Sequence, residues 1–158
     1  MTESTPTPTL DIDPRFTPRW SGRRRLPSTR RSLTHKFVIH GQNERFKGFL
    51  IVGLYDDATP GEIFITVDSA APDTRGALRD MATMTSITLQ WGCPIATIIK
   101  HLIHHRYEPA GLTSNPAIPI AKSISDYIGR WLAITFLTTE QQLAAGIPPA
   151  PTQGASKP

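Results

Sequence analysis

Three histidines in the C-terminal half of the chain have a spacing that a metal ion could use. His101 and His105 are four residues apart with His104 beside them, so two imidazoles would share one face of a helix. Unlike the HExxH zinc motif, the group has no glutamate between its histidines and no cysteine nearby. We favour the alternative, a solvated helix face opposite a stripe of isoleucines. No metal is therefore predicted, and His101 and His105 stay as weak candidates.

The single cysteine and two further histidines carry weaker signals. Cys93 precedes Pro94 at a predicted helix start, a location that can lower the pKa of a thiol. A small side chain buried at a helix junction explains Cys93 equally well. One cysteine excludes an internal disulfide and any site built from several thiolates. His35 and His40 flank a short predicted strand, and we interpret both as polar groups at strand ends.

Acidic residues at two turns are the remaining candidates for acid–base chemistry. The acids of the stretch DDATPGE (56–62) surround Thr-Pro-Gly, which is ordinary turn composition. Arg106 and Glu108 in RYEPAG fit a loop held in one shape, so they are candidates for a functional loop. We favour a structural ion pair, either between these two residues or across the loop. The chain has no GxxxxGK or GxGxxG loop to bind a phosphate.

Positive charge is concentrated in one arm near the N-terminus. Residues 1–14 contribute a formal charge of −3, residues 15–36 contribute +8 and residues 37–158 contribute −1, which together give the +4 of the chain. Arginine pairs its planar fork with phosphate, and aromatic rings in the arm could stack on bases. The arm predicts binding of nucleic acid or of an acidic protein, although we favour an extended basic tail that crosses the domain and only solvates it. The candidate contact residues are Arg15, Arg19, Trp20, Arg23, Arg24, Arg25, Arg30, Arg31 and Lys36.

A strand and a long helix between Pro60 and Trp91 must form the support for these groups. Branched and aromatic residues alternate over 63–67, which is typical of a packed strand. After the breaker AAPD, apolar residues recur at helical spacing from residue 78 to residue 91. Asp73 or Thr74 is expected to cap this helix, and Gly92 to end it.

The rest of the chain predicts an α+β fold. Alternating segments over 35–41 and 46–57 precede the strand at 62–67, and together they predict an antiparallel three-stranded meander. Gly53 inside the second segment indicates a bulge or a close backbone approach. Apolar stripes predict a second helix from Pro94 to near Arg106 and a third helix from Ile120 to Phe136. We therefore expect the meander to pack against three helices, with turns and loop over 107–119.

Length and composition indicate one domain with disordered ends. A chain of 158 residues with 39% hydrophobic content can bury one core. We expect a Thr- and Pro-rich disordered segment over 1–22, the domain with its basic lead-in arm over 23–138, and a disordered tail over 139–158. Neither a secretory signal nor an apolar run long enough to span a bilayer is visible, so we expect a soluble cytoplasmic protein with no membrane partner.

Five blocks of sequence, taken in order, carry a resemblance to a known family. They are THKFVIHG, GLYDDATPGEIFITV, GALRDMATMTSITLQWGCPI, RYEPAG and NPAIPIAKSISDYIGRWL. Together they resemble the TSCPD domain found near the C-terminus of adenosylcobalamin-dependent (class II) ribonucleotide reductases. The stretch RRRLPSTRRS is similar to the segment that leads into that domain, so the resemblance covers residues 23–137. Five ordered blocks are far more specific than one short motif.

The resemblance implies an accessory role rather than catalysis by this chain alone. Class II reductases use a cobalamin-generated thiyl radical and several redox cysteines, and this chain has one cysteine. At the position of the family's signature, AAPDT keeps Pro72 and Asp73 but has no cysteine, which puts a thiol or metal role there in doubt. We expect no cofactor on this chain and adenosylcobalamin in the partner enzyme.

Three functions of different classes follow from the sequence. The first, which we favour, is a stand-alone or split accessory domain that has a non-catalytic part in deoxyribonucleotide synthesis and docks on a class II reductase chain. The second is a nucleic-acid-binding or regulatory module that uses the arginine-rich arm. The third is a small enzyme or metal protein that uses the histidine group. Self-association into a homo-oligomer stays open.

Overall fold

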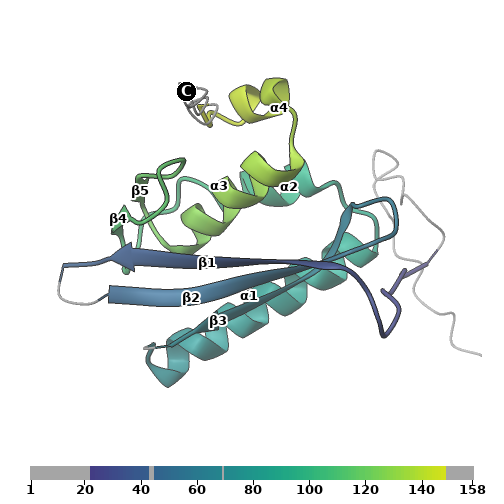
Figure 1. Ribbon diagram of the computed structural model, residues 1–158, viewed down its shortest axis with the longest axis horizontal. Coiled ribbons are helices and arrows are strands. Elements are labelled where there is room, and N and C mark those ends of the chain that lie inside the picture. Colours follow the sequence, from purple (N-terminus) through teal and green to yellow (C-terminus); the bar gives the residue numbers. More distant parts are fainter. Residues whose placement is uncertain (1–21, 43–44, 69, 149–158) are drawn as a thin grey trace, which may run out of the picture.

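The protein folds as an α+β unit around one antiparallel sheet (Figure 1). The structure, a computed structural model, describes residues 22–42, 45–68 and 70–148. The sheet has five strands in the order β3-β2-β1-β4-β5. The strands are β1 (Ser32–His40), β2 (Arg45–Leu54), β3 (Pro60–Val67), β4 (Gly111–Thr113) and β5 (Ile120–Ala121), and the helices are α1 (Pro72–Gln90), α2 (Ile95–Lys100), α3 (Ile124–Phe136) and α4 (Thr139–Ala144).

The α+β class and the meander of the first three strands are confirmed, but the sheet and the set of helices are larger than predicted. β2 pairs antiparallel with β1 along all nine residues of β1 and with β3 on its other side. Gly53 marks a register shift against β3, as predicted from a glycine inside a strand. The glycine also makes room there, because a Cβ on Gly53 would lie 2.5 Å from a carboxylate oxygen of Glu62.

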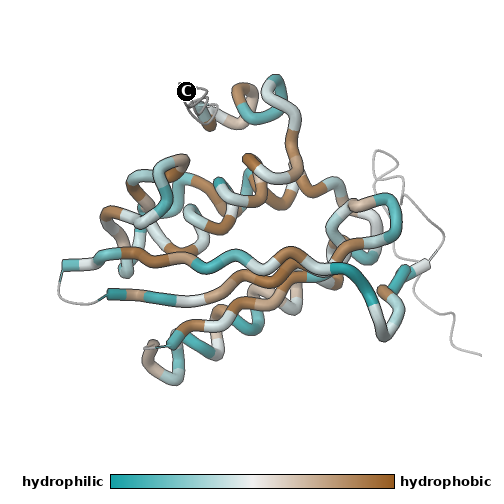
Figure 2. Tube along the Cα trace, in the orientation of Figure 1, coloured by the Kyte–Doolittle hydropathy of each residue, from teal (hydrophilic) through white to brown (hydrophobic). Residues whose placement is uncertain are grey.

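One face of the sheet and three helices enclose a single core. Side chains alternate along a strand, so Phe37 and Ile39 of β1 lie on the same face as Leu50 and Val52 of β2. All four are at most 1% exposed, and they belong to one apolar cluster with residues of α1, α2 and α3. Figure 2 shows apolar segments along the strands and in parts of these helices. We call this side of the sheet the core face and the opposite side the outer face.

Helix α1 covers the edge of the sheet at β3. The Oγ atom of Ser86 accepts a hydrogen bond from the N–H of Ile63 at 2.9 Å, and the Nε2 atom of Gln90 donates to the carbonyl oxygen of Gly61 at 3.1 Å. These two side chains therefore replace the strand that would otherwise pair with β3. An edge that is covered in this way cannot recruit another strand.

Two of the helix starts differ from the predictions, and one predicted helix end is confirmed. Neither Asp73 nor Thr74 caps α1, because the chain enters the helix through Pro72 and the cap residue is Ala71 without a side-chain bond. Gly92 does end the helix, with a left-handed φ of 89°. Helix α3 begins at Ile124 rather than Ile120, since the hydroxyl of Ser123 accepts the N–H of Asp126 and fixes the start.

Helix α2 is much shorter than predicted. The isoleucine stripe predicted a helix to near Arg106, but α2 ends at Lys100, and His104 adopts a positive φ of 69°. A residue in that conformation cannot continue a right-handed helix. The predicted shared helix face for His101 and His105 is therefore wrong.

Two regions predicted to lack regular structure contain it. The turn-rich stretch 107–119 includes β4, which extends the sheet together with β5. The predicted disordered tail instead forms α4, and a capping box joins Thr138 and Gln141 at its start. Residues 149–158 of the tail and the predicted disordered segment up to residue 21 lie outside the described residues. None of the described helices combines the length and apolarity needed to cross a bilayer.

Candidate functional site

The outer face of the sheet carries an apolar centre that the core does not use. Phe49 and Ile51 of β2 point to this face, and Phe64 of β3 lies directly opposite Ile51. None of the three belongs to the core cluster or packs against it, and Phe64 is 47% exposed. In an antiparallel sheet the solvent face is commonly polar, so an apolar centre there is a candidate surface for contact with another molecule. We call these three residues the docking patch.

Basic residues stand beside the docking patch on the same face. Lys36 of β1 is the direct neighbour of Phe49, and Arg45 begins β2. Lys47 pairs with Asp68 at 3.2 Å, whereas no carboxylate among the described residues pairs with Lys36 or Arg45. The outer face therefore combines apolar groups with positive charge that no described carboxylate pairs, which suits an acidic and apolar protein surface.

The described part of the basic arm lies against the domain and uses its guanidinium groups there. Arg23 donates to Gln90 at 2.9 Å, and Arg24 lies over the ring of Tyr55, 4.5 Å from its centre. Arg30 is paired with Glu62, and Arg31 donates to the carbonyl oxygen of Asp56 at 3.0 Å. These contacts leave Arg23, Arg24, Arg30 and Arg31 engaged within the chain, while Arg25 is exposed. Arg15, Arg19 and Trp20 lie outside the described residues.

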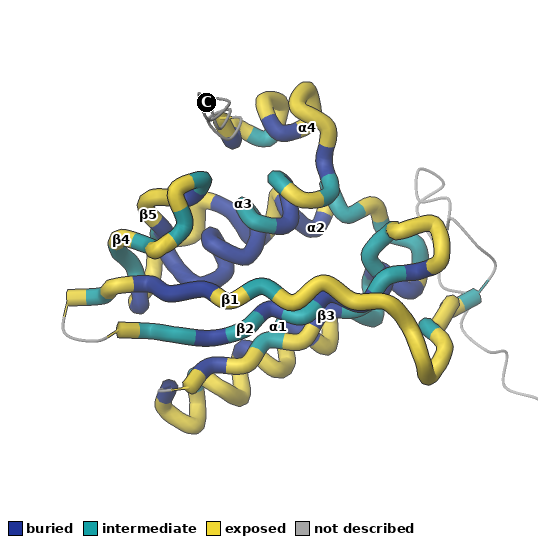
Figure 3. Tube along the Cα trace, viewed as in Figure 1, coloured by how far each residue is buried: buried dark blue, intermediate teal, exposed yellow. Residues whose placement is uncertain are grey.

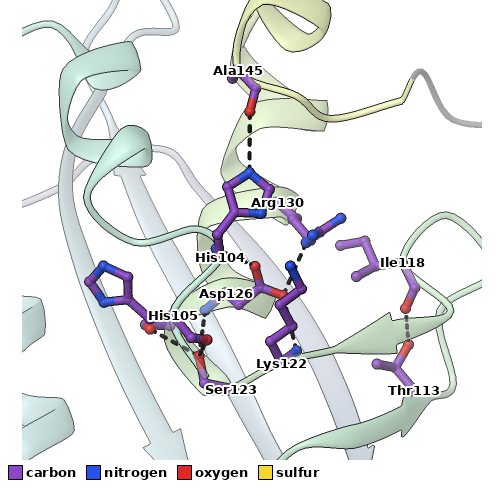
Figure 4. Close-up of polar contacts among 10 residues, drawn as sticks. His104, His105, Thr113, Ile118, Lys122, Ser123, Asp126, Arg130 and Ala145 are labelled. Atoms are coloured by element: carbon purple, nitrogen blue, oxygen red, sulfur yellow. Dashed lines mark hydrogen bonds and ion pairs between the residues drawn. The ribbon is translucent and has the colours of Figure 1, made fainter. Parts of the chain in front are cut away.

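A buried carboxylate that the sequence analysis did not single out organises the centre of the helical layer (Figure 4). Asp126 is 0% exposed and accepts hydrogen bonds from the N–H of His104 at 2.6 Å and of Lys122 at 3.0 Å. The Nε atom of Arg130, one helical turn away, donates to the same carboxylate at 3.0 Å. Burial alone raises the pKa of Asp126, but the two N–H donors and Arg130 together outweigh burial and hold this pKa below its ordinary value.

His35 is a mid-strand residue rather than the strand-end group that we predicted. Its ring stacks on Trp131 of α3, with 4.7 Å between ring centres, and its Nε2 atom lies 2.8 Å from the hydroxyl of Tyr127. Asn115 donates to the same hydroxyl at 3.1 Å, and the hydroxyl still has a proton that it can donate to a neutral His35. Burial lowers the pKa of His35, in agreement with the neutral ring. The contacts of His35 with Tyr127 and Trp131 therefore connect α3 to β1 of the sheet.

The histidines considered for metal binding do not converge. His101 and His105 are exposed, and the chain between them turns instead of continuing as a helix. The carbonyl oxygen of His105 accepts the hydroxyl of Ser123 at 2.8 Å, which is a structural contact. Within the described ranges no group of three or more His, Cys, Asp or Glu side chains is placed to hold a metal ion.

The predicted loop pair has other surroundings than we expected, whereas Cys93 agrees with the second of its two interpretations, since it is partly buried against the core at the junction of α1 and α2. Arg106 and Glu108 are exposed and form no ion pair in the described part of the chain, so the ion pair that we favoured is wrong. The carboxylate of Glu108 instead accepts the N–H of Ala110 at 3.0 Å. Burial raises the pKa of the Cys93 thiol, which opposes the lowering predicted from its place before a helix. Cys93 lines a pocket of about 170 Å³ between the sheet end and Phe136.

Comparisons with known proteins identify the family. The family model of the TSCPD domain matches residues 17–136 of this chain. The chain is 49% identical over 116 residues to a vitamin B12-dependent ribonucleotide reductase of Rhodopirellula baltica, which covers 73% of this chain and 11% of the reductase. It is 35% identical over 125 residues to the enzyme of the same name from Streptantibioticus cattleyicolor, which covers 79% of this chain and 20% of that protein.

The chain corresponds to a small part of these relatives. The chain spans between 11% and 20% of the length of these two reductases, so it corresponds to one part of them. No solved structure shows a significant match to the chain. The matched residues run from the basic arm through the end of α3 and include both the sheet and the Asp126 network. On this basis the chain belongs to the TSCPD domain family.

Proposed function

We propose that this chain is a non-catalytic accessory part of a vitamin B12-dependent ribonucleotide reductase and docks on the reductase catalytic chain in the cytoplasm. The observation that carries this proposal is the docking patch of Phe49, Ile51 and Phe64. Three apolar side chains at the centre of a sheet face, outside the core, are costly to leave in water and gain free energy when a partner covers them.

The family relatives support the choice of partner. In those proteins the corresponding segment is part of a much longer reductase polypeptide, so its surface has the rest of the reductase available to contact. In the proposed assembly the catalytic chain holds adenosylcobalamin and the redox cysteines. The single cysteine of this chain, with its raised pKa, is poorly suited to thiol exchange.

The experiment that tests this proposal is capture of the reductase chain from the organism's own cells by the tagged full chain. We expect a large reductase polypeptide to be retained, and Phe64→Asp to lower its capture at least tenfold, because a charge would be buried in an apolar contact. Met84→Asp is the matched control, since Met84 is 61% exposed on α1 and lies outside the docking patch. Equal capture by both variants would exclude the docking patch as the contact.

Nucleic-acid binding by the basic arm stays a prediction. It requires affinity that falls steeply with salt and with replacement of Arg23, Arg24 and Arg25 by alanine. Two of these three arginines already contact groups of this chain, so we do not base the proposed function on the arm.

A further inference from the structure

The first half of β1 has a strand neighbour on one side only. β2 pairs with β1 from Ser32 to His40, but β4 pairs with β1 only at Ile39 and His40. Among the described residues, no strand lies beside Ser32–Lys36 on the β4 side. Figure 3 shows this half of β1 as largely exposed, in contrast to its buried second half.

The chain after β4 turns away from β1 beyond Ser114. The N–H of Ser114 still reaches the carbonyl oxygen of Val38 at 3.3 Å. Asn115 then donates its side-chain amide to the hydroxyl of Tyr127, which directs the chain toward α3. Pro116 follows and has no N–H to offer β1. The edge is therefore left unpaired by specific contacts of the loop after β4, and no other segment among residues 22–42, 45–68 and 70–148 closes it.

Two residues of this edge direct their main-chain groups outward. In an antiparallel strand, the N–H and the C=O of one residue point to the same neighbouring strand, and those of the next residue point to the opposite side. Val38 points toward β4, so Thr34 and Lys36 point to the same side, where β4 is no longer present. No described residue hydrogen-bonds to the main chain of Thr34 or Lys36 on this side. As far as the described part of the chain is concerned, their N–H and C=O groups are thus available to an added strand.

A positively charged pocket lies at this open edge. It has a volume of about 470 Å³ and includes Lys36, Arg45, Asn115 and Tyr127 in its lining. Lys36 and Arg45 have no carboxylate partner among the described residues. A segment that paired with Thr34 and Lys36 would place its alternate side chains on the outer face, beside these two charges. Carboxylates at those positions would complete the two ion pairs.

We infer that the open edge of β1 binds an extended acidic segment of the reductase chain by strand addition, antiparallel to β1 and in line with β4. This inference rests on the proposed function and adds to it the site and the form of one contact. Strand addition uses main-chain hydrogen bonds for affinity and side-chain pockets for specificity, and this edge offers both. The added strand also continues the outer face, so a single partner covers the edge and the docking patch together.

Other occupants fit this edge less well. A nucleic acid has no peptide N–H and C=O groups that could form strand hydrogen bonds with Thr34 and Lys36. A second copy of this chain that paired edge to edge would bring Lys36 and Arg45 close to their own equivalents, and like charges in such a position repel. An acidic extended peptide satisfies both the main-chain groups and the charges.

Proline substitution tests the edge without breaking the sheet. Thr34→Pro removes an N–H that points away from β2, so the ladder inside the protein keeps its bonds, whereas an added strand loses a donor. Thr34→Ser keeps the N–H and serves as the matched control. A second variant, Lys36→Glu with Arg45→Glu, reverses the charge at exposed positions and leaves the main chain unchanged. Circular dichroism and the thermal midpoint establish that each full-length variant is folded.

The measurement is the Kd between each variant and the purified reductase chain, with amide hydrogen exchange of the complex. We expect Thr34→Pro and the double charge reversal each to weaken binding at least tenfold, Thr34→Ser to bind as the unmodified chain does, and exchange at Thr34 and Lys36 to slow in the complex. If both edge variants bind normally while Phe64→Asp does not, the edge inference is overturned and the proposed function stands. If the unmodified chain binds no reductase chain, both are overturned. A homodimer that Thr34→Pro converts to a monomer, with reductase binding unchanged, would assign the edge to a second copy and overturn the inference.

Discussion

The Oδ1 atom of Asp126 accepts a hydrogen bond from the main-chain N–H of His104 at 2.6 Å, and this bond joins α3 to the turn that ends α2. The two residues are 22 positions apart. Because the same carboxylate also accepts the N–H of Lys122 and the Nε–H of Arg130, it satisfies three donors at a site that water does not reach. Asp126 therefore holds α3 and the turn after α2 in a fixed position relative to each other.

Replacement of Asp126 by alanine is expected to lower the free energy of unfolding by about 3 kcal/mol, since it leaves buried N–H donors and an arginine without their acceptor. Urea denaturation of the full chain measures this loss. Asp80→Asn on the exposed surface of α1 is the control and should change stability by less than about 0.5 kcal/mol. A loss for Asp126→Ala no larger than that of the control would show that the network is not stabilising.

The same carboxylate predicts how stability responds to acid. The pKa of Asp126 in the folded protein lies below its ordinary value of 3.8, so the unfolded chain takes up a proton first as the pH falls. The stabilisation by Asp126 is fully present above that ordinary value and is lost as the pH falls through the lower folded pKa. The difference in unfolding free energy between the unmodified chain and Asp126→Asn should therefore shrink below about pH 4. A difference that stays constant down to pH 2 would contradict the assignment.

His35 predicts a second dependence, at higher pH. Burial lowers its pKa from the ordinary value of 6.5, so the unfolded chain binds this proton more readily than the folded chain does. Stability associated with His35 is present above pH 6.5 and falls as the pH decreases from there to the folded pKa. His35→Phe keeps an aromatic ring under Trp131 but cannot titrate. Urea titrations between pH 7.5 and pH 5 should show a smaller decrease for this variant, and equal decreases would exclude His35 as the source.

The sequence predicted those parts of the fold in which local pattern and tertiary contacts agree. The alternation in β1 to β3, the long apolar helix and the bulge at Gly53 depend on neighbours within a few residues, and each is present. The stripe of α2 continued to Ile103, yet the helix ends early because Asp126 binds the N–H of His104 from a distant segment. A period in the sequence carries no information about such a bond.

Two of the missed features did have local signals. Ser123 and Asp126 have the spacing of a helix cap with an acid in the first turn, just before an apolar run. Thr138 and Gln141 have the spacing of a capping box, which begins α4. The docking patch had no such signal, because Phe49, Ile51 and Phe64 look like core residues until the pairing of the strands assigns their face. The open edge of β1 likewise depends on where β4 stops.

The contact of α1 with the edge of β3 can be tested at Ser86, and a control residue is available in the same helix. Ser86 accepts the N–H of Ile63, and Ser86→Ala would leave that N–H without an acceptor at a residue that is 1% exposed. We expect a loss of about 1–3 kcal/mol in the free energy of unfolding, because a buried donor then carries its full desolvation cost. Thr83→Ala removes a hydroxyl that bonds only to the carbonyl oxygen of Arg79 on the exposed side of α1, so its loss should be below about 0.5 kcal/mol. Amide exchange at Ile63 should also become faster in Ser86→Ala alone, since the N–H gains access to water when the helix no longer holds it. Equal stabilities and equal exchange in the two variants would mean that α1 covers the edge of β3 by apolar packing and not through Ser86.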